Sequence, residues 1–240
     1  MTKFKRHLTI LAGLAALLAS CAPDPLAIPA PAKSVTREQA IATAYTYTRV
    51  QWTPEPRHIR HAPDSNGVLV HTPDTSLTEH GFSNGWWKPG QAATGMPYQW
   101  GGFDTPRQFL DSLARGESAG DISTAAKRRL GDYGTSAEAC GIDCSGFISR
   151  CWRLDRPHST KQLPAICTQL DSWSELQPGD ILLNDRHVLL FKAWWPDKKS
   201  ILCYEAGPFP VWSVNAARIT AAKLEREGYH PWRYRHITGS

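Results

Sequence analysis

Short apolar runs separated by turn residues follow one another through the last third of the chain. Runs of this length that are bounded by Gly, Pro, Asn and Asp are typical of β-strands. The pattern predicts strands at residues 181–183, 188–193, 200–205, 211–214 and 232–237. Successive strands joined by turns favour an antiparallel sheet.

Helical spacing of apolar residues is clearest at residues 144–154. The residues that would form one buried face there are Phe147, Ile148, Cys151 and Trp152. A second apolar stripe runs through residues 36–51, and Thr36 followed by Gln39 fits a capping box at its start. A helix that precedes an antiparallel sheet is typical of the α+β class.

The remaining pattern is less regular. Residues 52–95 are rich in Pro, Gly, His and Asp, and they contain one predicted strand at residues 67–71. Two more polar helices are predicted at residues 105–115 and 123–131. No internal repeat is visible. Together with the helix predicted at residues 36–51, this irregular segment forms an N-terminal region at residues 36–95.

The N-terminus has the layout of an export signal, with basic residues ahead of the apolar stretch 8–19. That stretch is too short to span a membrane, which takes roughly 20 residues. Leu18-Ala19-Ser20-Cys21 then resembles the lipobox of bacterial lipoproteins. It predicts removal of signal residues 1–20 and lipidation of Cys21. The alternative is a plain secretory signal with a chance cysteine.

Residues 21–35 contain four prolines and predict an extended tether behind the lipid anchor. We therefore expect an exported lipoprotein that is anchored to a membrane of the cell envelope. Ala22 after Cys21 is compatible with the outer membrane, with the protein facing the periplasm.

Composition excludes some classes of function. The chain has 27 Lys and Arg against 22 Asp and Glu, but three of the basic residues lie in the predicted signal. The mature chain is therefore nearly neutral, and without a basic stripe it is not expected to bind nucleic acid. Five cysteines follow Cys21, so an exported chain keeps at least one unpaired thiol. Their spacing includes no C-x-x-C, and no metal site is expected.

Cys144 carries the candidate chemistry because it stands directly before the helical pattern of residues 144–154. A thiol at a helix N-terminus is favoured as thiolate, and the free N–H groups of Cys144 and Ser145 can hold an oxyanion. The alternative is a small buried apolar residue. A bridge to Cys140 would silence this nucleophile.

His187 opens a predicted strand, from which an imidazole can point at the end of a helix packed across the sheet. A cysteine nucleophile needs such a base, and the base needs a third group that orients its ring. Glu205 on the next strand is the natural orienting residue, although a solvated carboxylate at a strand end is the simpler interpretation.

Three motifs resemble the NlpC-type family of cell-wall cysteine peptidases, in the family's order. Residues 97–102 (PYQWGG) are similar to its P-Y-x-W-G-G turn, and residues 143–147 (DCSGF) to its nucleophile motif. Residues 176–180 (LQPGD), followed by His187 and Val188, are similar to its L-x-P-G-D and H-V pair. Each motif alone is moderately specific, but the three in this order are a strong indication of the resemblance. They predict a domain of this type at residues 96–238.

The resemblance implies a papain-like core and cleavage of peptidoglycan stem peptides, often between D-glutamate and diaminopimelate. It makes Cys144 the nucleophile, His187 the base and Glu205 the third polar residue, and it places the Tyr98 hydroxyl beside the thiol. Asp143 and Ser145 fall where some members bind polar groups of the substrate. No metal or organic cofactor is implied, and we expect a monomer.

Two departures from the family stand out. An insertion at residues 103–142 separates the PYQWGG turn from the nucleophile, and we expect it to cover or narrow a cleft. The third catalytic residue is commonly His or Asn rather than Glu. Two other functions stay open: a papain-like amidase or acyl transferase with another substrate, and an inert lipoprotein that binds wall fragments.

Three further features are interpreted as structural. His58 and His61 lack a third ligand nearby in the sequence, so they are not expected to bind a metal. Trp86 and Trp87 are expected to be packing anchors. The basic run at residues 127–129 is expected on a solvated helix face.

Overall fold

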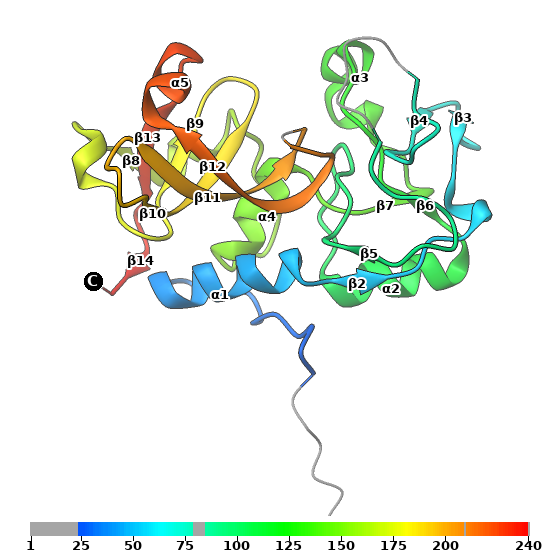
Figure 1. The fold of residues 1–240 in the computed structure, drawn as a ribbon, viewed down its shortest axis with the longest axis horizontal. Coiled ribbons are helices and arrows are strands. Elements are labelled where there is room, and N and C mark those ends of the chain that lie inside the picture. The colour runs from blue at the N-terminus through cyan, green and yellow to red at the C-terminus, as the bar shows by residue number, and fades with distance from the viewer. Residues whose placement is uncertain (1–23, 79–84, 209, 240) are drawn as a thin grey trace, which may run out of the picture.

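The centre of the fold is a six-stranded antiparallel sheet in the order β12-β11-β10-β9-β13-β8 (Figure 1). The computed structural model describes residues 24–78, 85–208 and 210–239. The strands of this sheet are β8 (Cys167–Gln169), β9 (Ile181–Leu183), β10 (Val188–Trp194), β11 (Ser200–Gly207), β12 (Ser213–Thr220) and β13 (His230–Tyr234). The predicted α+β class is confirmed.

Apolar side chains cover the sheet on both faces. On one face α4 (Cys144–Cys151) packs against β10 and β11, with Phe147 and Ile148 fully buried. α1 (Arg37–Thr48) lies against α4 (Figure 1). On the other face α5 (Ala221–Arg226) contributes Leu224 to a second cluster. The buried face that was predicted for residues 144–154 is confirmed.

The predicted capping box begins α1. The hydroxyl of Thr36 accepts the N–H of Gln39, and the Gln39 side chain accepts the N–H of Thr36. In the first turn Arg37 is buried and binds Asp180 at 2.9 Å. Arg233 binds the other oxygen of the same carboxylate at 2.7 Å. The LQPGD motif therefore ties α1 to β13 through its last residue.

A second layer lies beside the sheet, on the right in Figure 1, and is made of residues 52–95 together with the insertion. Its elements are β2 (Gln51–Trp52), η1 (Pro56–His58), β3 (His61–Pro63), β4 (Leu69–His71), β5 (Ala93–Thr94), α2 (Pro106–Arg115), β6 (Ser118–Ala119), α3 (Ala125–Leu130), η2 (Gly131–Gly134) and β7 (Ala139–Cys140). Outside both layers are β1 (Val35–Thr36), β14 (Ile237–Thr238), η3 (Leu163–Ile166) and η4 (Trp173–Glu175).

Side-chain hydrogen bonds join the two segments of this layer. Ser136 donates to Asp64 over 2.7 Å, and Arg60 binds Glu138 at 2.6 Å. The extension and the insertion are therefore one structural unit. The interpretation of residue 127 as solvated is wrong, because the Lys127 side chain is only 4% exposed and pairs with a buried carboxylate.

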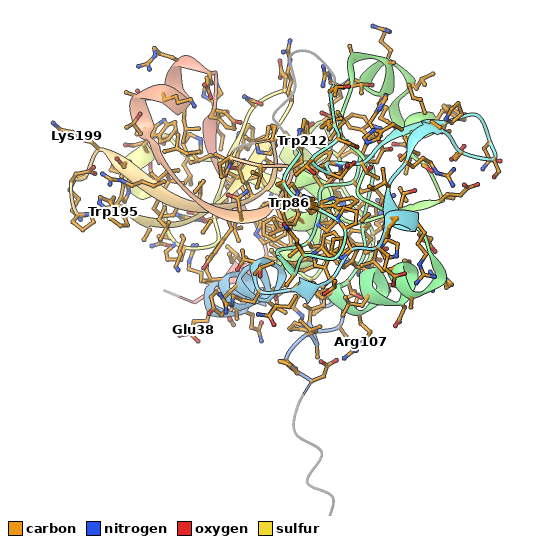
Figure 2. The ribbon with its side chains drawn as sticks, turned by 45° about the vertical axis from the view of Figure 1, so that its right-hand side comes forward. Glu38, Trp86, Arg107, Trp195, Lys199 and Trp212 are labelled. Carbon is orange, nitrogen blue, oxygen red and sulfur yellow. The ribbon has the colours of Figure 1, made fainter. Side chains whose placement is uncertain are left out.

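The tryptophans of the extension pack as predicted. Trp87 is 1% exposed, and Trp52 contacts both Trp86 and Trp87 edge to face. Trp86 reaches across to the other layer, where its indole N–H donates to the carbonyl oxygen of Trp212 over 2.8 Å (Figure 2).

The proline-rich segment contacts the domain and is not a free tether over residues 24–34. Asp24 pairs with Arg107 of α2 at 2.6 Å. Arg153 donates to the carbonyl of Ala30 and accepts the N–H of Ala32 at its own carbonyl. Residues 24–34 are therefore docked on the domain. The predicted signal and Cys21 lie outside the described residues, and no helix within the described ranges is long and apolar enough to cross a membrane.

Candidate active site

Cys144 is the first residue of α4, and its side chain is 6% exposed. Asp143 caps the helix because its carboxylate accepts the N–H of Gly146. The same oxygen accepts the Ser145 hydroxyl over 3.0 Å, and the other accepts the N–H of Gly101. Both oxygens of Asp143 are thus engaged in holding the helix start, and contact of Asp143 and Ser145 with substrate stays a prediction.

The PYQWGG turn packs directly on this helix start. The N–H of Asp143 donates to the carbonyl of Gly102 over 3.1 Å. A Cβ added at Gly146 would lie 2.4 Å from that same carbonyl oxygen. Glycine is therefore required at position 146 by the close approach of the two backbones. The first two motifs are therefore in direct contact beside Cys144.

His187 and Glu205 form the second half of the site. Nε2 of His187 lies 2.6 Å from Oε2 of Glu205, and the imidazole also interacts with Cys144. Because Nε2 faces the carboxylate, Nδ1 is the nitrogen left for the sulfur. The predicted nucleophile, base and orienting residue are brought together from α4, the start of β10 and β11.

Charge stabilises the protonated imidazole. Burial alone would lower the pKa of His187, but the adjacent Cys144 and Glu205 outweigh it and raise that pKa to about 10. Glu205 is 1% exposed, so the simpler interpretation as a solvated strand-end carboxylate is wrong. Its Oε1 is buried and has no hydrogen-bond partner among the described residues. Among the described residues, the imidazole of His187 is therefore the one hydrogen-bond partner of the Glu205 side chain.

Two further residues position His187, one through its backbone and one through the space left for its ring. Oδ1 of Asn184 accepts the backbone N–H groups of Arg186 and His187, each over 2.9 Å. Gly207 of β11 leaves room for the ring, since a Cβ there would lie 2.4 Å from Cε1 of His187. The asparagine three residues before the histidine is a sequence signal for such a turn.

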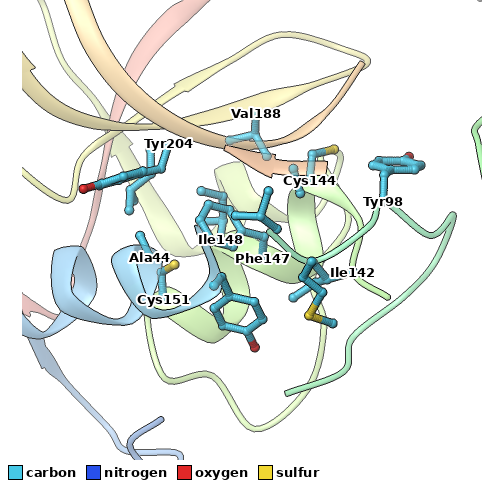
Figure 3. Packing of buried hydrophobic residues seen from close by; sticks show 14 of the residues in the cluster. Ala44, Tyr98, Ile142, Cys144, Phe147, Ile148, Cys151, Val188 and Tyr204 are labelled. Carbon is cyan, nitrogen blue, oxygen red and sulfur yellow. The ribbon is translucent and has the colours of Figure 1, made fainter. Parts of the chain in front are cut away.

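Tyr98 lies beside Cys144 at the N-terminal end of α4, whereas Cys151 lies at the other end (Figure 3). The Tyr98 ring is 4% exposed and contacts Trp212 with ring centroids 5.1 Å apart. Burial and the neighbouring Cys144 and Asp143 raise the pKa of Tyr98 well above its ordinary value. Its hydroxyl therefore stays protonated and can donate a hydrogen bond near the thiol. Trp212 is a site residue that sequence reasoning missed.

None of the five described cysteines forms a disulfide. Cys140 instead directs its thiol at the carbonyl of Ser118, 3.4 Å away. The bridge from Cys140 to Cys144, which would have silenced the site, is not formed. Burial raises the thiol pKa of Cys140, Cys151 and Cys203, and that of Cys167 to about 12. These four buried thiols are poor nucleophiles at neutral pH.

A surface groove of about 810 Å³ begins beside the turn that precedes His187. Its lining combines charged side chains such as Arg186 and Glu227 with apolar ones such as Trp232. Cys144 is not among its lining residues, so the groove flanks the candidate site and does not contain it.

Within the described ranges, no group of three or more His, Cys, Asp or Glu side chains has an arrangement that could hold a metal ion. His58 is buried and bonds to the backbone of Glu55 and Leu113, while His61 pairs with Asp74 at 2.8 Å. Comparison of the chain with protein-family models, with curated proteins and with solved structures found no match in any of the three.

Proposed function

We propose that this protein is an exported cysteine peptidase of the NlpC type, with a papain-like core, that hydrolyses amide bonds in peptidoglycan stem peptides. The observation that carries the proposal is the arrangement of Cys144, His187 and Glu205. A buried thiol at a helix start interacts with an imidazole, and a carboxylate 2.6 Å from the imidazole holds its other nitrogen. Nucleophilic cysteine catalysis needs these three parts in this order.

The reaction starts from a thiolate–imidazolium pair, in which Cys144 has already given its proton to Nδ1 of His187. The thiolate then attacks the carbonyl carbon of the scissile amide and forms a tetrahedral oxyanion. The N–H of Cys144 lies in the first helical turn, where no intrahelical carbonyl accepts it, and it is placed to hold that oxyanion. The N–H of Ser145 already donates to the carboxylate of Asp143.

Collapse of the oxyanion breaks the C–N bond, and His187 gives its proton to the leaving amine. A thioester of Cys144 remains. Water then attacks the thioester while His187 removes its proton, which releases the carboxylic acid and restores the thiol. Throughout, Glu205 fixes the imidazole tautomer and stabilises the imidazolium.

The choice of substrate rests on the resemblance of the three motifs and on the predicted lipobox. The bond between D-glutamate and diaminopimelate is the expected target. If Cys21 is lipidated, only Ala22 and Pro23 separate the anchor from docked Asp24, a reach of about 10 Å. The α2 end of the domain would therefore stay close to the membrane.

Digestion of purified peptidoglycan followed by mass spectrometry of the fragments tests the proposal. We expect cut stem peptides with a new amine and a new carboxylate, and no cleavage by Cys144→Ala. Full cleavage by Cys144→Ala would refute the mechanism. Release of ammonia or transfer of an acyl group, without a cut stem, would instead identify an amidase or acyl transferase.

A further inference from the structure

A buried ion pair lies in the insertion, close to the candidate site but outside it. Nζ of Lys127 on α3 binds Oδ2 of Asp121 at 2.6 Å, and the side chains are 4% and 0% exposed. Lys127 also donates to the carbonyl of Gly134 over 3.0 Å. Oδ1 of Asp121 accepts the backbone N–H of His71 at the end of β4. The pair therefore joins three segments of the second layer.

The backbone of Asp121 is paired with the PYQWGG turn. Its N–H donates to the carbonyl of Tyr98 over 2.8 Å, and its carbonyl accepts the N–H of Trp100 over 2.9 Å. The contact is close, since a Cβ at Gly120 would lie 2.7 Å from the Tyr98 oxygen. The position of Tyr98 thus depends directly on that of Asp121.

Two residues further along, Ser123 reaches the side chain of Tyr98. Its hydroxyl interacts with the phenol of Tyr98 and lowers the pKa of that group, whereas the neighbouring Cys144 raises it. From the opposite side Trp212 packs on the ring and accepts the Tyr98 N–H over 3.0 Å. The phenol is therefore held between the insertion and the loop before β12.

We propose that the insertion is a working part of the site, in which Ser123 and the Asp121–Lys127 pair are positioning residues that hold the Tyr98 hydroxyl against the Cys144 thiol. The proposal rests on the proposed function, because it assigns the phenol a role at the nucleophile. It gives residues 103–142 a role beyond covering a cleft, since they set the reactivity of the thiol itself.

Alkylation of Cys144 by iodoacetamide provides a readout that needs no substrate. We expect Ser123→Ala to change the pH profile of alkylation and to lower kcat for stem-peptide cleavage about three- to tenfold, with KM unchanged. Ser123→Thr, which keeps the hydroxyl, should restore both. Ser174→Ala, at an exposed serine of η4, serves as the matched control and should change neither.

A double-mutant cycle with Tyr98→Phe decides whether the serine acts through the phenol. The proposal predicts that Ser123→Ala has no further effect once Tyr98 is Phe. Additive effects of the two substitutions, or an unchanged alkylation profile in Ser123→Ala, would overturn it. If stem peptides are not cleaved by the unmodified protein but alkylation still responds to both residues, the proposed function fails and the positioning role stands.

The ion pair is tested by removing both charges together, because a single deletion leaves an unpaired buried charge and endangers folding. We expect Asp121→Asn combined with Lys127→Met to keep a cooperative thermal transition. It should reproduce the altered alkylation profile and lose its effect in the Tyr98→Phe background. A folded double variant with the unmodified profile would contradict the role of the pair.

Discussion

Replacement of Glu205 by glutamine tests how the site stabilises its imidazolium. Glu205→Gln keeps a side chain of the same size but removes the charge that lies 2.6 Å from Nε2 of His187. The two side chains are 2% and 14% exposed, so solvent screens the pair little. The substitution should therefore act on the protonation of His187 and leave the fold intact.

The size of the effect follows from the contact. An opposite charge at this separation typically raises a pKa by about one to three units, each worth about 1.4 kcal/mol. The pKa of His187, raised to about 10 by Cys144 and Glu205 against burial, should fall by that amount in the variant. Weaker stabilisation of the imidazolium then lowers kcat/KM about ten- to a thousandfold.

The pH dependence of kcat/KM is the assay that separates this effect from misfolding. The imidazolium is lost as pH rises through the pKa of His187, so this pKa sets the alkaline limb of the profile. We expect the limb to move to lower pH in Glu205→Gln and to stay in place in Glu225→Gln, a matched change at an exposed glutamate of α5. An alkaline limb that does not move in Glu205→Gln would refute the reasoning.

Two further predictions concern packing. Gly207→Ala should displace the imidazole of His187, because the added Cβ would lie 2.4 Å from Cε1. We expect kcat/KM to fall at least about tenfold while the circular dichroism spectrum stays unchanged. A variant with full activity would contradict the geometry. Asp180→Asn leaves Arg37 and Arg233 without their shared buried carboxylate. Urea denaturation should show a loss of about 3 to 5 kcal/mol in unfolding free energy, and a loss below about 1 kcal/mol would contradict the assignment.

Local sequence patterns predicted the sheet and the start of α1 well. The predicted strand at residues 181–183 matches β9, and β10 begins at the predicted Val188. These strands are buried apolar runs bounded by turn residues, so their pattern is unambiguous. β12 is much longer than predicted, since exposed polar residues such as Arg218 alternate along an edge strand. β8 and α5 are short, and no apolar period indicated them.

The second layer could not be predicted because its contacts join residues far apart in the chain. The hydrogen bond from Ser136 to Asp64 spans 72 positions, and that from His71 to Asp121 spans 50. No periodicity reports such pairings. Lys127 illustrates the consequence. Its neighbours Arg128 and Arg129 are exposed, whereas Lys127 is buried because it pairs with Asp121, six residues earlier.

The site itself was predictable to the level of its chemical groups. The motifs indicated Cys144, His187 and Tyr98, and the strand pattern indicated Glu205. The residues that set the geometry were not indicated as such, since the roles of Asn184, Gly207 and Trp212 depend on how the turn and the neighbouring strands close around the imidazole and the phenol.

Alkylation of the native protein with iodoacetamide at neutral pH, followed by peptide mapping, tests the central claim most directly. The other four described cysteines are buried thiols whose pKa is raised, so they provide little background. We predict rapid and selective labelling of Cys144 that slows to the rate of an ordinary thiol in His187→Ala. Slow labelling of Cys144 in the native protein, or a rate that His187→Ala leaves unchanged, would contradict the account.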